Sequence, residues 1–481
     1  MKRQKHNLSN YKLATADMGQ LIPVQVQEVL PGDTMQIDTS ALIRMSPMLA
    51  PVMHPMTVRF HHWFVPNRLV WDGWEDFITG GEDGDNSDMI PTVTQTDDAN
   101  NLLDYMGVPP VDGAEVNAIP IRAYNLIYNE FYRDQDLQGE WELDNLDVKN
   151  VAWRKDYFTA SRPFAQKGND VILPIGDSAP VLRNPGFDTD NWLNNEAQSS
   201  DIALNESNQY VSGLSGDGTP LNIHPNYLHA DLSQATGITA SQFREFFALQ
   251  RFAEARARYG SRYTEYLQYM GVRPSDARLQ RPEYLGGGKK NLQISEVLQT
   301  AQDDQGQEET FVGTMRGHGI TALKTRKARK FFEEHGTIIT VMSVVPKSIY
   351  QDGSQRLFLK RDRNQFFQKE LQSIGQQEIK KGEVYTTEDN VNNHDTFGYT
   401  DRYSEYTWTP STISGEFRNI LDHWHLGRTF EQPPELNSAF ISCWPSKRIF
   451  AEQTKHSLWC MINNKTIARR IVQKKSVGRL M

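Results

Sequence analysis

Residues 56–65 read MTVRFHHWFV and residues 337–345 read TIITVMSVV, and these two runs decide the fold class. Both are rich in β-branched and aromatic residues, and Met56–Val65 begins with apolar and polar residues in alternation, so each run predicts a β-strand. Further strands are predicted at Leu21–Val29, Asp170–Leu173, Gly398–Thr409 and Ser457–Ile462. The predicted strands are short and far apart, with no strand–helix rhythm. This spacing favours an antiparallel sandwich with large connections over a doubly wound sheet.

Three helices are predicted between these strands. Ile119–Leu137 has Pro120 in its first turn, where a missing N–H costs nothing. Thr239–Tyr259 opens with a capping-box pattern and stops at a glycine, and Tyr263–Met270 follows it. We expect the apolar stripes of the two longer helices to pack in the core. The stripe residues are Ala123, Leu126, Ile127 and Phe131 in the first helix, and Phe243, Phe246, Phe247, Leu249 and Phe252 in the second.

The composition indicates a folded chain with much wet surface. Only 38% of the 481 residues are hydrophobic, and the mean hydropathy is −0.60, yet there are ten tryptophans. Cys443 and Cys460 are too few for a disulfide framework, and we expect two buried thiols in a reducing cytoplasm. Residues 1–18 show no apolar signal segment, and the longest uncharged apolar run, Gly336–Pro346, is far shorter than the ~18 residues of a membrane helix. We expect synthesis and folding in a cytoplasm.

Charge is distributed unevenly along the chain. Residues 1–16 carry four basic and no acidic residues, and residues 453–481 carry seven basic and no acidic residues. The body between residues 17 and 452 has 40 basic and 60 acidic residues, a net charge of −20. Basic ends on an acidic body suit a soluble protein whose termini contact a polyanion, although ordinary solvated tails would carry the same charges.

The segment Ile175–Ser233 has an unusual composition. It contains one basic residue, Arg183, eight acidic residues, many asparagines and four prolines. Such a segment cannot bury much apolar area, and uninterrupted loops of this length tend to be functional. We therefore expect a polar surface insertion.

No catalytic or metal-binding constellation is evident. Gly286–Lys290 (GGGKK) lacks the spacing of a phosphate-binding loop and is better explained as a flexible turn. His61, His62, His423 and His425 could bind a metal, but no partner follows at a typical spacing, so structural histidines are favoured. Aromatic residues interleave with arginines at Arg251–Tyr269 and Tyr399–Trp408, as in proteins that bind single-stranded nucleic acid. Core packing and ion pairs are favoured there, because the same runs carry acidic residues. We expect no catalytic residue, cofactor or metal site.

Several motifs, taken in order along the chain, resemble the major capsid proteins of microviruses of the gokushovirus type. The opening motifs are Leu30–Pro31–Gly32–Asp33 and Phe64–Val65–Pro66–Asn67–Arg68–Leu69–Val70–Trp71. The next are Arg122–Ala123–Tyr124–Asn125, Asn129–Glu130–Phe131, Arg133–Asp134 and Asp156–Tyr157–Phe158–Thr159. The most specific are Gly260–Ser261–Arg262–Tyr263 and Asp276–Ala277–Arg278–Leu279–Gln280–Arg281–Pro282–Glu283–Tyr284–Leu285–Gly286–Gly287. The last are Glu334–His335–Gly336, Phe397–Gly398–Tyr399, Gly415–Glu416–Phe417–Arg418 and Trp424–His425.

The resemblance implies a mainly β fold, an eight-stranded antiparallel jelly roll with long, partly helical loop insertions. It also implies that the subunit is not an enzyme. Pentamers of the chain would form a T=1 icosahedral capsid of sixty copies around circular single-stranded DNA of a bacteriophage. The implied partners are the chain itself, the packaged DNA, other virion, pilot or scaffolding proteins and a host receptor, with no membrane insertion. The protein would be made and assembled in the bacterial host cytoplasm and would end in the virion. The family often ends in a Pro/Tyr/Gly-rich tail, which Val477–Met481 lacks.

The resemblance and the charge pattern together predict five regions. These are a basic N-terminal arm (1–20), the first part of the jelly roll with a helical loop (21–174), the polar surface insertion or threefold protrusion (175–233), helical insertions with the remaining strands (234–452), and a basic C-terminal strand and tail (453–481). We expect the packaged DNA to be faced by Lys2, Arg3, Lys5, Arg469, Arg470, Lys474 and Lys475. We expect host contact from Trp192, Asn194, Asn195, Asn205 and Tyr210.

Two alternatives belong to other functional classes. Aromatic residues on a β scaffold would also suit a jelly-roll carbohydrate- or receptor-binding protein, which a single strong hit on a glycan array without particle formation would favour. A metal-dependent enzyme would need stoichiometric zinc or iron held by the four histidines. Proline- and aromatic-rich stretches such as Trp63–Trp71 suit contacts between subunits as well as packing within one subunit.

Overall fold

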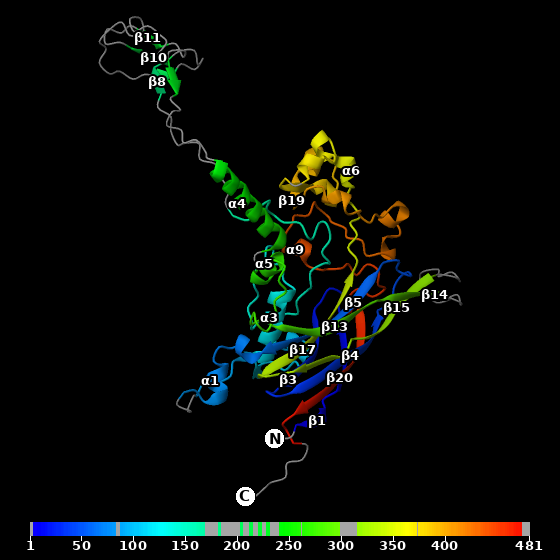
Figure 1. Cartoon of the computed structure of the whole chain (residues 1–481). Helices are drawn as coiled ribbons and strands as arrows, with labels where there is room; N and C mark the ends of the chain where they lie inside the picture. Colours follow the sequence, from blue (N-terminus) through cyan, green and yellow to red (C-terminus); the bar gives the residue numbers. More distant parts are fainter. Residues whose placement is uncertain are drawn as a thin grey trace. The chain divides into compact units, whose positions relative to one another are not determined.

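The computed structural model describes residues 3–82, 87–168, 240–260, 262–298, 315–372 and 374–473, together with the backbone of five short strands between residues 181 and 230. The chain divides into two compact units. The larger unit comprises Met1–Ala165 and Arg256–Met481, and the smaller unit comprises Gln166–Ala255. Antiparallel pairing joins all the named strands, so the prediction of a mainly β, antiparallel architecture is confirmed (Figure 1).

The larger unit contains a seven-stranded sheet with the order β1-β20-β4-β15-β14, in which β2 also pairs with β20 and β16 also pairs with β4. The strands are β1 (Gln4–Asn7), β2 (Asn10–Ala16), β4 (Thr34–Met45), β14 (Gln293–Leu298), β15 (Met315–Lys324), β16 (Ala328–Phe331) and β20 (Leu458–Arg470). Strand β20 is central, because β4 pairs with one of its edges and β1 and β2 pair with the other. Residues 4–7 and 10–16, near the start of the chain, therefore pair with its last long strand.

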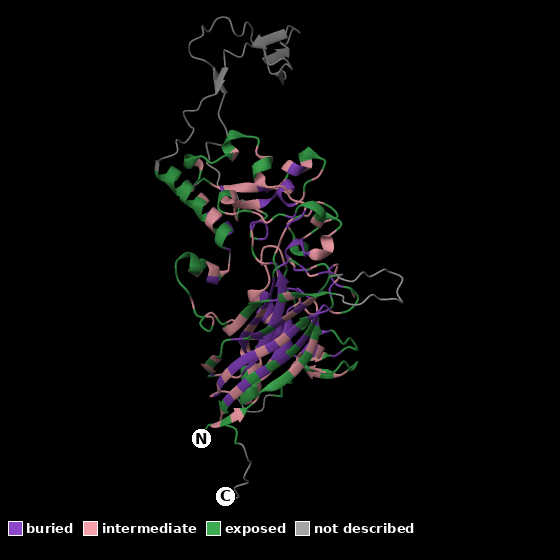
Figure 2. Cartoon of the chain, turned by 90° about the vertical axis from the view of Figure 1, so that its right-hand side faces the viewer, coloured by how far each residue is buried: buried purple, intermediate pink, exposed green. Residues whose placement is uncertain are grey.

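A four-stranded sheet has the order β13-β5-β17-β3. Its strands are β3 (Ile22–Val29), β5 (Met56–Pro66), β13 (Glu283–Asn291) and β17 (Gly336–Pro346). One hydrophobic cluster contains Ile43 and Ile462 from the first sheet together with Phe60 and Val344 from the second, so the two sheets pack face to face. Figure 2 shows the buried residues concentrated on these strands.

The other face of the four-stranded sheet is covered by helix α3 (Ile119–Phe131). Ala123, Ile127 and Trp63 share one buried cluster, and Leu126 and Phe131 pack against it, so the predicted stripe of this helix is confirmed. The helix ends at Phe131 and not at Leu137. The guanidinium of Arg262 donates to the carbonyls of Asn129 and Glu130 and satisfies the last turn of the helix.

The remaining elements of the larger unit are short. The strands are β6 (Thr92–Thr94), β7 (Glu115–Asn117), β18 (Gln376–Lys380) and β19 (Thr396–Asp401). The α-helices are α1 (Trp74–Thr79), α2 (Leu102–Met106), α5 (Tyr263–Tyr269), α6 (Arg356–Leu359), α7 (Lys381–Val384), α8 (Asn390–His394) and α9 (Ser438–Ile441). Single 3-10 turns lie at Asn67–Leu69, Arg363–Gln365, Lys369–Leu371, Ser404–Tyr406, Gly415–Arg418 and Asp422–Trp424. A third hydrophobic cluster, with Phe158, Tyr350 and Phe397, holds many of these loops together.

The smaller unit contains short antiparallel pairs and much of a long helix. Its strands are β8 (Val181–Arg183), β9 (Ala203–Leu204), β10 (Val211–Leu214), β11 (Pro220–Ile223) and β12 (Leu228–Ala230). Helix α4 (Ala240–Tyr259) begins here and crosses the boundary between the units in sequence. Its predicted core stripe is wrong: Phe243, Phe247, Leu249 and Phe252 are all exposed, and most of α4 has the exposed colour in Figure 2. The buried side chains of the helix are instead the small ones of Ala253 and Ala257.

The outcome for the other predicted elements is mixed. Strands β3, β5 and β17 confirm three predictions, and Ser457–Ile462 is the first half of β20. Gly398–Thr409 is wrong beyond Asp401, because Tyr403 adopts a positive φ of 64° and a 3-10 turn follows. Asp170–Leu173 lies outside the described residues. Tyr263–Met270 is confirmed as α5.

The glycine run Gly286–Gly288 lies in strand β13 and is not a flexible turn. The register with β5 shifts between Tyr284 and Gly286, where Gly286 has φ of 139°. A Cβ on Gly287 would lie 2.1 Å from the carbonyl oxygen of Phe60. The glycines therefore allow a bulge and a close approach between two backbones, and this structural requirement explains the run.

Candidate nucleic-acid interface

The outward face of the seven-stranded sheet is built by the alternation of its strands. Along β20 the side chains of Leu458, Cys460 and Ile462 are buried, while those of Trp459 and Met461 are exposed. The alternation continues to the end of this 13-residue strand, because successive side chains of a strand point to opposite faces. One face thus packs in the core and the other is free.

Seven exposed basic side chains lie on this outward face. The strand register places them on the same side as Trp459, and they come from β1, β4, β15, β16 and β20. We call this surface the basic face; its members are Lys5, Arg44, Arg316, Lys324, Arg329, Lys465 and Arg469. Among the outward-facing strand residues described, the one acidic residue is Asp38, opposite Lys465 and only 7% exposed. The surface therefore presents a positive field although the whole chain has a net charge of −9.

Aromatic side chains are interspersed with these charges. Tyr11 is 58% exposed, Trp459 45% and Phe331 47%. Trp459 lies opposite Arg44, and both line a cleft of about 620 Å³ whose other lining residues include Leu13, Met461 and the acidic Asp104. Exposed aromatic rings stack on bases while basic side chains neutralise phosphates, and this combination binds single-stranded nucleic acid without reading its sequence.

Of the predicted DNA-facing residues that the structure describes, two lie on the basic face and two make contacts within the chain. Lys5 and Arg469 lie opposite one another on the basic face. Arg3 donates to the carbonyl oxygen of Gly32 at 2.8 Å, and its guanidinium lies 5.2 Å from the ring centroid of Phe331. Arg470 points the other way, and its Nη2 lies 2.7 Å from Oδ2 of the fully buried Asp33.

The remaining predicted site residues lie outside the described residues. These are Lys2, Lys474 and Lys475 among the DNA-facing candidates, and Trp192, Asn194, Asn195, Asn205 and Tyr210 among the host-contact candidates.

Sequence reasoning missed the basic residues that come from the middle of the chain. Arg44, Arg316, Lys324 and Arg329 lie on β4, β15 and β16, none of which was predicted as a strand. The signal was available for β4, because residues 34–45 place Met35, Ile37 and Ile43 on one face and Arg44 on the other.

The histidines considered as metal ligands are held by the fold. His62 is fully buried, and its ring nitrogens lie 2.8 Å and 3.2 Å from the hydroxyls of Thr340 and Thr325. Burial lowers the pKa of His62 to about 4, so the ring is neutral at neutral pH. His423 belongs to a 3-10 turn, and the Nε2 of His425 lies 2.7 Å from the carbonyl oxygen of Phe417. In the described part of the chain, no three His, Cys, Asp or Glu residues cluster as a metal site would require.

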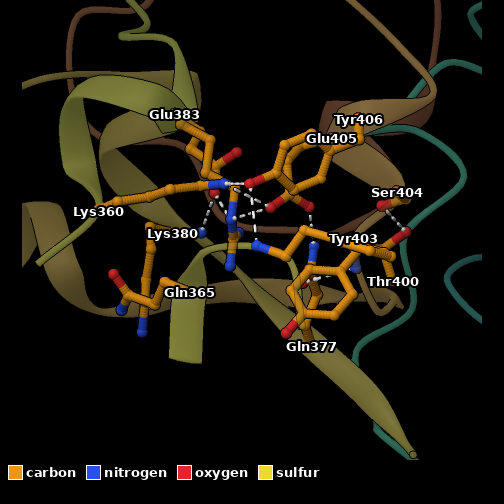
Figure 3. Close-up of polar contacts among 12 residues, drawn as sticks. Lys360, Gln365, Gln377, Lys380, Glu383, Thr400, Tyr403, Ser404, Glu405 and Tyr406 are labelled. Atoms are coloured by element: carbon orange, nitrogen blue, oxygen red, sulfur yellow. Dashed lines mark hydrogen bonds and ion pairs between the residues drawn. The ribbon is translucent and has the colours of Figure 1, made fainter. Parts of the chain in front are cut away.

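Glu383, Glu405 and Lys360 belong to a buried cluster of carboxylates and cations (Figure 3). Glu405 accepts from Lys360 at 3.0 Å and from Gln377 at 2.6 Å. Arg356 bridges it to Glu383 with contacts of 3.5 Å and 2.8 Å. Burial alone would raise the pKa of Glu405, but the hydrogen bonds from Gln377 and Lys360 outweigh it and lower this pKa. Because both carboxylates are engaged by cations, the cluster fastens the loops around α6, α7 and β18.

Both cysteines are free and buried, as predicted. Burial raises the pKa of the Cys460 thiol to about 12, which leaves it protonated and unreactive. In the part of the chain that the structure describes, no helix has both the length and the apolar surface needed to cross a membrane.

Comparison with known proteins decides the family. The family model described as "Capsid protein (F protein)" matches residues 1–477. The chain belongs to this capsid-protein family. It is 35% identical to "Capsid protein VP1" of Bdellovibrio phage phiMH2K over 91% of this chain and 87% of that protein. It is 31% identical to "Capsid protein VP1" of Chlamydia phage 1, over 92% and 89% of the two chains, and 29% identical to that of Spiroplasma virus 4, over 91% and 87%.

Membership of this family indicates what the exposed faces of the chain, including the seven-stranded sheet, can meet. The chain is a microvirus major capsid protein of the gokushovirus type, a structural component of a phage virion. A protein of this kind self-assembles into a shell, so its exposed faces meet neighbouring copies, solvent or the contents of the particle.

Proposed function

We propose that this capsid protein forms a T=1 icosahedral shell of sixty copies, arranged as pentamers, and that its basic face lines the interior against circular single-stranded DNA. The observation that carries the proposal is the basic face, because seven exposed cations and three exposed aromatic rings share one surface. A sheet face that concentrates cations on an acidic chain is suited to lie against a polyanion such as single-stranded DNA.

The proposed core is an eight-stranded jelly roll. The order β2-β20-β4-β15 in one sheet and β3-β17-β5-β13 in the other support it. In a jelly roll the first and last strands of the sequence pair, and successive strands alternate between two sheets except for the middle two, which pair with one another as β5 and β13 do here. Here β2 pairs with β20 and β3 with β17, while β4 and β5 occupy the third place in each order. β1, β14 and β16 extend this core at its edges.

The two basic ends among the five predicted regions can be assigned roles on this core. Residues 1–20 and 453–481 act together, because β1 and β2 pair with β20. The DNA contact therefore rests on Lys5, Arg469 and the mid-chain cations of the basic face, while Arg470 serves the fold through Asp33. Lys2, Lys474 and Lys475 continue the same basic ends in sequence and stay candidates for DNA contact.

The insertion at 175–233 is proposed to contact the host. Its acidic, asparagine-rich composition and its place between two blocks of the larger unit support a surface role. The contact would use Trp192, Asn194, Asn195, Asn205 and Tyr210, and adsorption of particles lacking part of the insertion would test it. Pilot or scaffolding proteins and a host receptor complete the proposed partners, and assembly in the host cytoplasm precedes the virion.

Expression of the full chain with negative-stain microscopy and nuclease treatment tests the proposal. We expect closed particles of uniform size that protect single-stranded DNA from nuclease. A quadruple variant of the basic face, K324Q/R329Q/K465Q/R469Q, should still form particles but protect much less DNA. A chain that stays monomeric under all conditions of assembly, or variant particles that protect as much DNA as the wild type, would contradict the proposal.

A further inference from the structure

A second basic surface lies on the opposite sheet. A cleft of about 360 Å³ opens on the face of the four-stranded sheet that points away from the seven-stranded sheet. On β5, Arg59 and His61 point into this cleft, while the alternate residues Phe60 and His62 face the core. We call it the arginine cleft; its charged lining residues are Arg59, Arg133, Asp134, Arg154, Lys155, Arg162, Arg262 and Glu265.

Four of the six cations in the arginine cleft already have partners. The Nη2 of Arg133 lies 2.8 Å from Glu140, and the Nη1 of Arg162 lies 3.1 Å from Asp136. Lys155 pairs with Asp134. Arg262 is held by the carbonyls at the end of α3.

Arg59 and Arg154 differ from these four cations. Among the described residues, no carboxylate lies within ion-pair distance, 4.0 Å, of either guanidinium. Arg154 donates from Nη2 to the hydroxyl of Thr57 at 3.0 Å, while its Nε is buried without a hydrogen-bond acceptor. Burial, and then the positive charge of Arg154, lowers the pKa of Arg59. Both guanidiniums thus line one cleft, and within the described part of the chain neither has a carboxylate as counter-ion.

The surroundings indicate which ligand charge would fit the cleft. Burial lowers the pKa of His61 to about 4, so this ring adds no charge at neutral pH, and Ser343 lies opposite Arg59 on β17. A single carboxylate would leave one of the two guanidiniums uncompensated, whereas a phosphate dianion balances both. Guanidinium groups bind phosphate oxygens with paired, charge-assisted hydrogen bonds. The volume lies within the range of about 300–1,000 Å³ typical of small-molecule sites.

We propose that the arginine cleft binds a phosphate group, as inorganic phosphate or as a small phosphate monoester, through the guanidiniums of Arg59 and Arg154. The site lies on the opposite sheet from the basic face and does not depend on the proposed contact with packaged DNA. Ligand binding would relieve the repulsion between the two cations and stabilise the subunit.

Thermal unfolding of the full-length protein in inorganic phosphate, compared with chloride at equal ionic strength, tests the proposal. We expect a saturable rise in Tm with phosphate. Arg59→Gln and Arg154→Gln should each raise the apparent Kd for phosphate by at least about tenfold, the scale of one lost charge-assisted hydrogen bond. The control Arg361→Gln, which removes an exposed charge elsewhere, should respond like the wild type. Without phosphate, Arg59→Gln should melt no lower than the wild type, because it removes an unpaired, partly buried charge.

Adenosine monophosphate at the same concentrations distinguishes the two ligand sources. A larger shift than with inorganic phosphate assigns the site to a nucleotide, and an equal or smaller shift assigns it to free phosphate. The proposal is overturned if the wild type shows no phosphate-specific shift, or if Arg361→Gln loses the response as Arg59→Gln does. It is also overturned if Arg59→Gln blocks assembly while phosphate binds neither subunits nor particles, because a carboxylate of a neighbouring copy would then fill the cleft. If Arg59→Gln does not fold, Arg59→Lys replaces it in the test. Lysine keeps the positive charge but lacks the planar guanidinium that donates two parallel hydrogen bonds, so this variant must still weaken phosphate binding.

Discussion

Lys5 of β1 lies directly opposite Arg469 of β20, and both side chains are exposed on the same face of the sheet. Like charges directly opposite one another destabilise a strand pair. The pairing also joins the two basic ends of the chain, which are more than 460 residues apart in sequence. A surface that brings such charges together is suited to a polyanion.

Replacing Lys5 by Gln should therefore have opposite effects on stability and on binding. The free energy of unfolding of the free chain should rise by about 0.2–1 kcal/mol as the repulsion is removed. Affinity for single-stranded DNA should fall, and the slope of log K against log salt should decrease by about 0.7 for the lost phosphate contact. Denaturant unfolding and a salt titration of binding measure the two effects. Equal losses in Lys5→Gln and Arg361→Gln would show that only net charge matters.

Trp459→Ala should weaken binding of single-stranded DNA by about 1–3 kcal/mol, the range for loss of one base-stacking aromatic side chain. Trp444 gives a matched control, because it is also exposed, 70% against 45%, but does not belong to β20. Fluorescence anisotropy with a homopolymer oligonucleotide measures both variants. If Trp444→Ala loses as much affinity as Trp459→Ala, stacking on the basic face is wrong.

Arg470→Gln should lower the stability of the subunit without a specific effect on DNA. The carboxylate of Asp33 is fully buried, and Arg470 supplies its cation at 2.7 Å, so the variant leaves an uncompensated buried charge. The expected loss of unfolding free energy is about 3–5 kcal/mol. Arg68→Gln, which breaks a more exposed pair with Glu334, should cost about 1 kcal/mol or less. Chemical denaturation of both variants checks the difference, and similar losses would contradict the role given to Asp33.

Acid should destabilise the subunit partly through His62. Its pKa is lowered to about 4 in the fold from an ordinary value near 6.5, so the unfolded chain binds its proton more readily. The contribution of His62 to stability is thus complete above about pH 6.5 and is lost progressively as the pH falls towards 4. His62→Gln should unfold with a flatter dependence on pH between 4 and 6.5. An unchanged slope would mean that folding does not lower the pKa of His62.

Gly287→Ala should be strongly destabilising, because its Cβ would meet the carbonyl oxygen of Phe60 at 2.1 Å. The close approach is between two backbones, so no side chain can move aside to relieve it. Gly139→Ala adds the same methyl group where nothing lies within 4 Å, and should be neutral or slightly stabilising. Thermal unfolding compares the two, and a tolerated Gly287→Ala would show that the bulge in β13 can shift.

The strands rich in β-branched and aromatic residues could be predicted from sequence, whereas the polar strands could not. Thr337–Val345 is a run of apolar and β-branched residues, and every residue of β17 is buried. β13 reads EYLGGGKKN, a sequence that resembles a turn and becomes a strand only because β5 requires close contact with it. In β13, pairing with β5 overrides the preference of the glycine-rich sequence for a turn.

The candidate interface could be predicted only where the chain's charge pattern was visible by itself. Lys5 and Arg469 lie in terminal segments without acidic residues, so their charges stand out in the sequence. Arg44 and Lys324 also lie in stretches without acidic residues, 39–71 and 310–332, but these stretches are inside a body of negative net charge, and only the register of β4 with β20 and β15 shows that the two side chains share a face. The exposed phenylalanines of α4 were misassigned because an apolar helical stripe has the same sequence pattern whether it is buried within one chain or left exposed on it.

A cryo-electron microscopy reconstruction of intact, DNA-filled particles would show which face of the seven-stranded sheet borders the genome. We expect a closed shell of sixty copies in which the outward face of β20 borders the interior, with nucleic-acid density touching Lys465, Arg469 and Trp459. A shell in which this face points to the outside, or is fully covered by a neighbouring subunit with no density for nucleic acid, would contradict it.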